Sequence, residues 1–211
     1  MHMKKLLLLA LFCLVGSGVY AQKNSHNGHE WVDLGLPSGL KWATCNVGAS
    51  SPEDYGYYYA WGETSTKGDY SWSTYEWFDN FTRTVTKYKA DELDPSDDAA
   101  RANWGGYWRL PTKKEFEELR EHCTWEWTTQ NSHKGYKVTS KKNGQSIFLP
   151  AAGWRLGADD YSVGSYGYYW SSSPIESDAS YAYYLYFYED YHNVDWGYRY
   201  CGHSVRPVLE D

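Results

Sequence analysis

The sequence is short of leucine, positive charge and long apolar runs. After the first fifteen residues leucine is scarce, which disfavours a helical bundle, and no collagen-like or coiled-coil period occurs. Lysine and arginine total 20 against 27 aspartate and glutamate, giving a formal net charge of −7. Since phosphate binding needs a basic face, we do not expect a nucleic-acid partner. The apolar run at residues 6–15 is too short to span a bilayer and no longer one follows, so we expect no transmembrane segment.

Aromatic residues are the abundant class. The chain has 12 Trp, 22 Tyr and 6 Phe, and aromatics make up 19% of it. Disordered chains carry few aromatics, so a folded protein is expected. Tyrosine and tryptophan favour sheets. The length suits one domain with a substantial core, which we place at residues 31–211.

Residues 1–21 have the features of a secretory signal peptide. Two lysines precede the apolar stretch, and small residues near its end suit a cleavage site before Gln22. An uncleaved N-terminal anchor is the alternative. We expect a secreted protein located in the periplasm, outside the cell or on its outer surface. Residues 22–30 are polar and are predicted to form a flexible lead-in.

Two helices are predicted near the middle of the chain. The first follows an acidic, proline-containing start at residues 94–98 and ends before a Gly-Gly pair. The second begins with a capping box, in which Thr112 is the N-cap and Glu115 lies three residues later.

The rest of the chain has short strand-like segments between turn signals. The predicted strands are two within residues 31–49, joined by a turn at residues 37–39, then residues 57–63, a hairpin around residues 142–144, and residues 168–172, 181–188 and 204–208. Strands followed by two helices and further strands indicate an α+β fold rather than repeated βαβ units.

Common catalytic motifs are missing from the sequence: no HExxH, GxSxG, GxGxxG, P-loop or CxxC string occurs. Three groups of carboxylates could supply oxygens to calcium, although none has the EF-hand spacing. These groups are Asp94/Asp97/Asp98, Asp159/Asp160 and Glu189/Asp190/Asp195. We interpret them as a helix start and solvated loop charges. We therefore predict no catalytic residues, no metal ligands and no cofactor, with a structural calcium ion as the alternative.

Tyrosine is concentrated near the C-terminus, with 12 Tyr at residues 161–200. Strand alternation at residues 181–188 puts Tyr183, Leu185 and Phe187 on one face, which should be the core face. The opposite tyrosines should be exposed, and tyrosine offers rigid contact area plus a hydroxyl, as in antibody loops. An ordinary sheet is the alternative. The predicted ligand-binding residues are Tyr184, Tyr186, Tyr188, Asp190, Tyr191, His192, Asn193, Asp195, Trp196, Tyr198 and Tyr200.

A series of motifs runs in one order along residues 31–208. They are VDLGLPSGLKWATCNVGA, YAWGET, DDAARANWGGYWRLPTKKEFEEL, CTWEWTT, NGQSIFLPAAGWR, YGYYWSSSP and GHSVRPV. Together they resemble the major paralogous domain first described in Fibrobacter succinogenes and abundant in secreted Bacteroidetes proteins. The residues themselves leave open how Cys45, Cys123 and Cys201 pair. The resemblance implies a disulfide between Cys45 and Cys123, because WATC and CTW both recur in it.

The segment WRLPTKKEFEEL is also similar to the RLPTEAEWE signature of formylglycine-generating-enzyme folds. That resemblance implies a loop-rich C-type-lectin-like domain, with two helices packed on twisted, mostly antiparallel sheets. The catalytic cysteine pair of those enzymes is not matched, because Cys201 stands alone. The sugar-binding Glu-Pro-Asn and Trp-Asn-Asp motifs of calcium-dependent lectins are missing too.

The C-terminal stretch also resembles the mutable surface of target proteins of diversity-generating retroelements. Mutation at adenines turns AAC codons into those for Tyr, Asp, His, Ser, Cys or Gly, and residues 190–193, Tyr198 and residues 200–203 are rich in these types. A diversified binding face is one hypothesis, and ordinary divergence between paralogues is the favoured one.

We predict a secreted, non-catalytic binding protein that presents a Tyr-rich C-terminal surface to a protein or glycan ligand. The alternatives are a structural cell-surface or fimbria-associated subunit and a formylglycine-generating-type oxidase. Arg109 and Arg206 recur in the resembling motifs and should have structural roles, since arginine offers a planar five-donor fork. The predicted core residues are Trp42, Trp61, Trp104, Trp108, Leu110, Phe116, Leu119, Phe148, Leu149, Trp170, Leu185, Phe187 and Val205.

Overall fold

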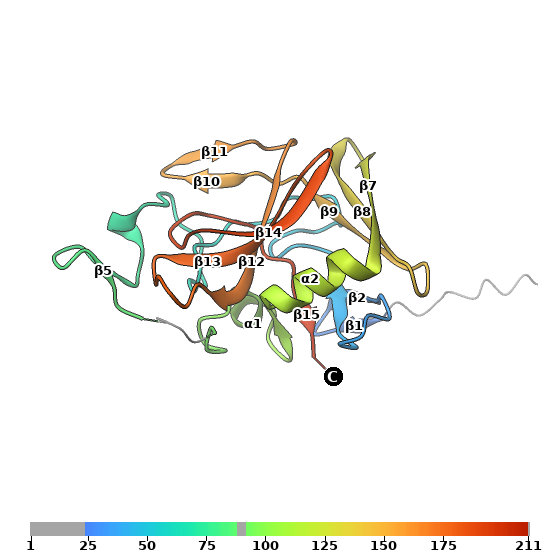
Figure 1. Cartoon of the computed structure of the whole chain (residues 1–211), viewed down its shortest axis with the longest axis horizontal. Helices are drawn as coiled ribbons and strands as arrows, with labels where there is room; N and C mark the ends of the chain where they lie inside the picture. The colour runs from blue at the N-terminus through green and yellow to red at the C-terminus, as the bar shows by residue number, and fades with distance from the viewer. Residues whose placement is uncertain (1–23, 88–91, 211) are drawn as a thin grey trace, which may run out of the picture.

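The computed structural model describes residues 24–87 and 92–210, so the predicted signal peptide lies outside the described residues. Strands dominate this part of the chain, which has 15 strands, two α-helices and one short 3-10 helix (Figure 1). The strands form five sheets, and every pairing between them is antiparallel.

The largest sheet joins the two ends of the described chain. Its strand order is β1 (Ser25–His26), β2 (His29–Asp33), β3 (Lys41–Ala43), β15 (Val208–Leu209) and β6 (Trp108–Arg109). Val208 pairs with Trp42 on one side and with Arg109 on the other, so the C-terminal strand β15 lies between β3 and β6. The two strands predicted within residues 31–49 are confirmed, whereas residues 25–30 contribute strand structure instead of a flexible lead-in.

A three-stranded sheet carries the tyrosine-rich part of the chain. It consists of β12 (Gly167–Pro174), β13 (Tyr181–Tyr188) and β14 (Tyr191–Tyr198), with β13 in the centre. Helix α2 (Lys113–His122) crosses one side of this sheet and contacts all three strands (Figure 1). The bounds of β13 are those predicted from alternation.

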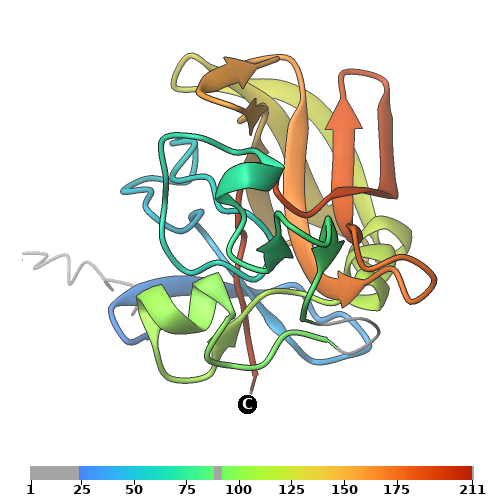
Figure 2. The same cartoon turned by 90° about the vertical axis from the view of Figure 1, so that its left-hand side faces the viewer.

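A second three-stranded sheet lies beside it and consists of β7 (Cys123–Gln130), β8 (His133–Ser140) and β9 (Ser146–Pro150). Two small hairpins complete the strands. They are β10 (Trp154–Leu156) with β11 (Asp159–Tyr161), and β4 (Phe78–Asp79) with β5 (Thr84–Val85), the latter preceded by the 3-10 helix η1 (Trp72–Thr74). In Figure 2 the η1 region lies in front of the larger sheets, on the side away from β7 and β8.

Both predicted helices are present, and each begins at a side-chain N-cap. Thr112 and Glu115 form the predicted capping box of α2, in which each side chain accepts from the other's backbone N–H. Helix α1 (Ala99–Trp104) follows the predicted acidic start, in which residues 94–97 form a turn and Asp98 is the N-cap. Oδ2 of Asp98 also accepts the N–H of Leu110 at 2.8 Å, which ties α1 to the chain before α2.

The predicted α+β, C-type-lectin-like class is wrong for this structure. The described residues are mostly β, with several small sheets, and the two helices have only six and ten residues. Segments without a strand prediction form β7, β10, β11 and β14, since backbone pairing with a neighbouring strand stabilises even polar stretches. The predicted strand at residues 57–63 makes only an isolated bridge from Tyr59 to His203.

The core is built as predicted. Every predicted core residue is buried, from Trp42 and Trp61 with no exposed surface to Trp104 with 8% exposed. Both arginines have structural contacts. Arg109 donates to both carboxylate oxygens of Glu115 and to Glu210, and the buried Arg206 donates to Oδ1 of Asn46 and to the backbone of Ala43.

The predicted Cys45–Cys123 disulfide is not formed. Cys45, Cys123 and Cys201 are all free thiols. The two proposed partners lie in different surroundings: Cys123 is buried in the core with Phe116, whereas Cys45 is only half-buried after β3 and its Sγ lies 3.6 Å from Oγ1 of Thr44.

Candidate functional site

The candidate site is the side of the β12–β14 sheet that lies opposite α2. Residues paired across strands project to the same side of a sheet. Tyr186 pairs with Tyr168 of β12 and with Asn193 of β14, and Tyr188 pairs with Tyr191. The surface, here named the tyrosine face, comprises Tyr166, Tyr168, Tyr184, Tyr186, Tyr188, Tyr191, Asn193 and Asp195.

The phenol rings of the tyrosine face contact one another in a continuous series. Tyr166 stacks on Tyr186 with ring centres 5.9 Å apart and planes 13° apart. Tyr188 stacks on Tyr191 at 5.3 Å and 21°. The ring of Tyr168 lies 4.9 Å from that of Tyr186. Such ring pairs add attraction beyond area burial, so the series forms one rigid aromatic surface.

Exposure increases along the tyrosine face. Tyr184 is half-buried and lies 5.7 Å from the ring of the fully buried Trp170. Tyr188 and Tyr191 are 37% and 41% exposed. Burial raises the pKa of Tyr184 and of Tyr186 above the ordinary tyrosine value, so both phenols stay neutral at ordinary pH and can donate hydrogen bonds.

His203 lies beneath the tyrosine face. Its imidazole stacks on Trp170 at 4.0 Å and meets Tyr184 edge-on at 4.9 Å. The residue is 3% exposed, and its Nδ1 makes no hydrogen bond within the described part of the chain. Burial lowers the pKa of His203 to about 3, so the ring is neutral and packs as an apolar group. Backbone bonds to Tyr59 hold it in place.

Carboxylates border the tyrosine face. Asp195 pairs with Tyr184, while Glu189 and Asp190 form the two-residue turn between β13 and β14. None of these three acids has an ion pair with a basic side chain of the described residues. The face thus combines neutral aromatic rings with unpaired negative charge.

Gly197 of β14 makes room for Tyr184. It pairs with Ala182, so both project to the same side as Tyr184. A Cβ at Gly197 would lie 2.8 Å from Cε1 of Tyr184, which is closer than real side chains approach. The absence of a side chain at Gly197 therefore allows the observed position of the Tyr184 ring in the tyrosine face.

His192 is a predicted site residue that the structure places elsewhere. Alternation along β14 turns it to the α2 side of the sheet, opposite Asn193. There its ring stacks on Trp125 at 4.4 Å and 12°, and its Nδ1 accepts a hydrogen bond from Nε of Arg120. Burial is the main cause of its lowered pKa. This geometry gives His192 a packing role between α2 and the sheets.

Trp196 and Tyr198 also lie on the α2 side of β14. They are 52% and 42% exposed, and Tyr200 follows the strand with its ring stacked on Tyr198 at 5.4 Å. The predicted site residues therefore occupy two surfaces of one sheet rather than a single surface.

Three contributors to the site are not among the residues predicted from the sequence. Tyr166 and Tyr168 continue the alternation of a tyrosine-rich strand, which could have been found from the same period of two as in β13. Their position beside Tyr186 depends on long-range pairing, which local pattern does not show. His203 belongs to the stretch that resembles a diversified surface, but the sequence does not show that a bridge to Tyr59 places it beneath the tyrosine face.

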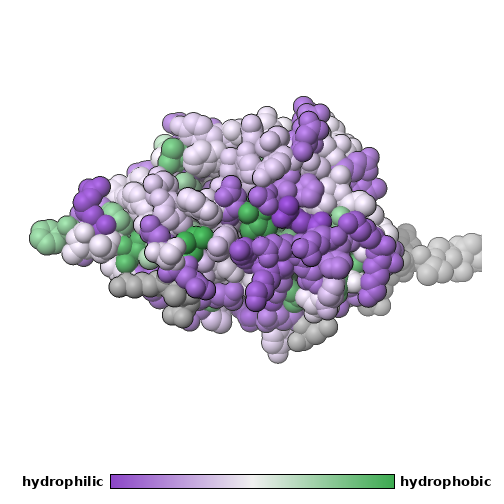
Figure 3. All heavy atoms as spheres, in the orientation of Figure 1, coloured by the Kyte–Doolittle hydropathy of each residue, from purple (hydrophilic) through white to green (hydrophobic). Residues whose placement is uncertain are grey.

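The face of the molecule seen in Figure 3 carries no single large hydrophobic patch. In Figure 3 strongly hydrophilic atoms gather over α2, the upper region near β10 and β11 is pale, and strongly hydrophobic atoms form only small separate patches. Within residues 24–87 and 92–210, no group of three or more His, Cys, Asp or Glu is placed to hold a metal ion. No helix in these ranges has the length and apolar character that crossing a membrane requires.

Cys201 is not arranged as a reactive thiol. It is 6% exposed, and burial raises the pKa of its thiol to about 12. Reaction as a nucleophile requires the thiolate, which this environment disfavours.

A family model described as a domain of unknown function, DUF8237, matches residues 125–208. The matched segment runs from β7 to the start of β15 and so contains the whole tyrosine face and His203. No curated protein and no solved structure matches the chain. The match covers less than half of the chain and carries no activity with it.

Proposed function

We propose that this chain is a secreted, non-catalytic binding protein whose tyrosine face contacts the surface of another protein. The observation that carries the proposal is the continuous series of contacting rings with exposed members Tyr188 and Tyr191. Tyrosine has only two side-chain torsions to fix, so such a surface binds with little loss of entropy.

A protein ligand fits the chemistry of this face better than a small molecule does. The rings lie side by side on a sheet, and their neutral hydroxyls can donate to backbone carbonyls of a partner. The unpaired carboxylates at Glu189, Asp190 and Asp195 favour a partner patch with lysine or arginine, through ion pairs at the rim and cation–π contacts with the rings.

The test is an array of cell-surface proteins probed with the chain from residue 22 onward. We expect a protein ligand whose binding is about 100-fold weaker for the double variant Tyr188→Ala/Tyr191→Ala, in the range of paired aromatic hot spots. Tyr107→Ala is the matched control, because Tyr107 is 59% exposed but lies outside the β12–β14 sheet.

Two results would count against the proposal. One is binding that survives the double variant while the fold, monitored by near-UV circular dichroism, is unchanged. The other is an equal loss in the Tyr107→Ala control, which would show that removal of any exposed ring weakens the interaction.

A further inference from the structure

A second aromatic surface lies on the α2 side of the β12–β14 sheet. It is here named the aromatic strip and consists of Trp72, Tyr181, Trp196, Tyr198 and Tyr200. Tyr181 stacks on Tyr198 at 4.6 Å and meets Trp196 edge-on at 4.8 Å. Trp72 extends the series, with its ring 4.7 Å from that of Tyr200.

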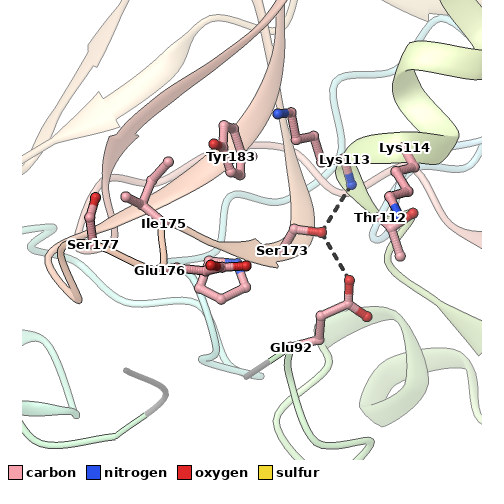
Figure 4. A pocket seen from close by; sticks show the side chains of 10 residues that line it. Glu92, Thr112, Lys113, Lys114, Ser173, Ile175, Glu176, Ser177 and Tyr183 are labelled. Carbon is pink, nitrogen blue, oxygen red and sulfur yellow. Dashed lines mark hydrogen bonds between the residues drawn. The ribbon is translucent and has the colours of Figure 1, made fainter. Parts of the chain in front are cut away.

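The aromatic strip adjoins a cavity at the start of α2. Trp196 pairs with Tyr183, and Tyr183 lines a cavity of about 630 Å³ (Figure 4). This volume is within the usual range for small-molecule sites, about 300–1,000 Å³. Figure 4 shows Tyr183 and Glu176 on one side of the cavity and the start of α2 on the other.

The cavity lining is polar, with neither sign of charge prevailing. Two lysines, Lys113 and Lys114, are matched by two glutamates, Glu92 and Glu176. Nζ of Lys113 lies 4.4 Å from the centre of the Tyr183 ring, so one lysine is already engaged with the aromatic wall. Hydroxyl groups, mixed donors and acceptors and an aromatic wall suit an uncharged ligand with many hydroxyls. A strongly charged ligand would meet unfavourable charge on one side of the cavity.

We propose that the aromatic strip and the adjoining cavity bind a neutral glycan chain. One sugar ring stacks on the exposed indole of Trp196, and its neighbour contacts the exposed edge of Tyr198, whose ring already stacks on Tyr181 and Tyr200. A further sugar residue enters the cavity beside Tyr183. The indole of Trp196 is half-exposed and supplies a large flat apolar surface. The glycan site and the tyrosine face lie on opposite sides of one sheet, so the protein can hold a polysaccharide and a protein partner at the same time.

The test uses cellulose, xylan, mannan and chitin as insoluble probes, with soluble oligosaccharides of each for affinity measurement. We expect retention on at least one probe, and Trp196→Ala and Tyr198→Ala should each weaken oligosaccharide binding about tenfold or more. Glu176→Gln should weaken oligosaccharide binding without abolishing it, because the aromatic strip still contacts the glycan. Thermal unfolding of each variant checks the fold, which exposed substitutions should leave intact.

The tyrosine-face variant Tyr188→Ala/Tyr191→Ala is the matched control and should bind the glycan normally. The proposal is overturned if no probe is retained, or if the control variant loses glycan binding while Trp196→Ala keeps it. Binding of a protein, and of no glycan, through Trp196 would also overturn it. None of these outcomes decides whether the tyrosine face binds a protein, which the Tyr188/Tyr191 variant on the protein array tests separately.

Discussion

Acidification should destabilise the protein through His203. The imidazole is buried between Trp170 and Tyr184, with an unbonded Nδ1 and a pKa lowered to about 3 from an ordinary value of 6.5. Below pH 6.5 the unfolded chain binds a proton at this residue and the folded chain does not. Stability is therefore fully present above pH 6.5 and is lost as the pH falls towards 3.

The magnitude follows from the two pKa values. One unit of pKa difference corresponds to about 1.4 kcal/mol, so lowering the pH from 7 to 5 should remove about 2 kcal/mol of unfolding free energy at this residue alone. Two other histidines, His29 and His192, have lowered pKa values as well and add to the total change. The contribution of His203 is therefore obtained by comparing the pH-dependent change in unfolding free energy of the protein with that of a variant that lacks this imidazole.

The assay is urea unfolding at pH 7 and pH 5 for the protein and for His203→Phe, which keeps an aromatic ring against Trp170. We expect the variant to lose about 2 kcal/mol less than the protein over this interval. If both lose the same amount, His203 is not held neutral beneath the tyrosine face, and the reasoning fails.

Three further predictions concern the fold around the site. Gly197→Ala should displace the Tyr184 ring and lower the unfolding free energy by about 1–3 kcal/mol in urea titration, whereas an unchanged value would contradict the close contact. The buried Tyr169, whose pKa burial raises to about 12, should ionise in the folded protein only far above pH 10, and stability should fall above pH 10. Phenolate absorbance of the protein minus that of Tyr169→Phe measures this, and a difference that titrates near pH 10 in the folded state would refute it. Arg109→Met should cost about 2–4 kcal/mol in thermal or urea unfolding, since it leaves two carboxylates without their partner, and a neutral effect would exclude the structural role.

Local signals in the sequence were sufficient for several elements. The alternation of residues 181–188 predicts the bounds of β13 and the burial of Leu185 and Phe187, because one face must be apolar. The Thr112–Glu115 capping box predicts α2 because it satisfies backbone donors within a few residues.

Other elements depend on distant partners and left no such signal. The strand β14 contains Asp, Asn, His and Gly, which are poor strand formers, and it exists because all eight of its residues pair with β13. The fold class was wrong for the same reason, since the missed strands shift the balance to β. Within the site, a continuous run of sequence was interpreted as one surface, although alternation sends Trp196 and Asp195 to opposite sides of the sheet.

The most direct test of partner binding at the tyrosine face is tyrosine footprinting of the complex with a protein ligand found on the array. Oxidative labelling of each tyrosine would be compared with and without ligand. We expect protection of Tyr188 and Tyr191, with Tyr198 and Tyr107 labelled as in the free protein. Protection of Tyr198 with Tyr188 and Tyr191 still open would contradict it, because the partner would then occupy the α2 side of the sheet.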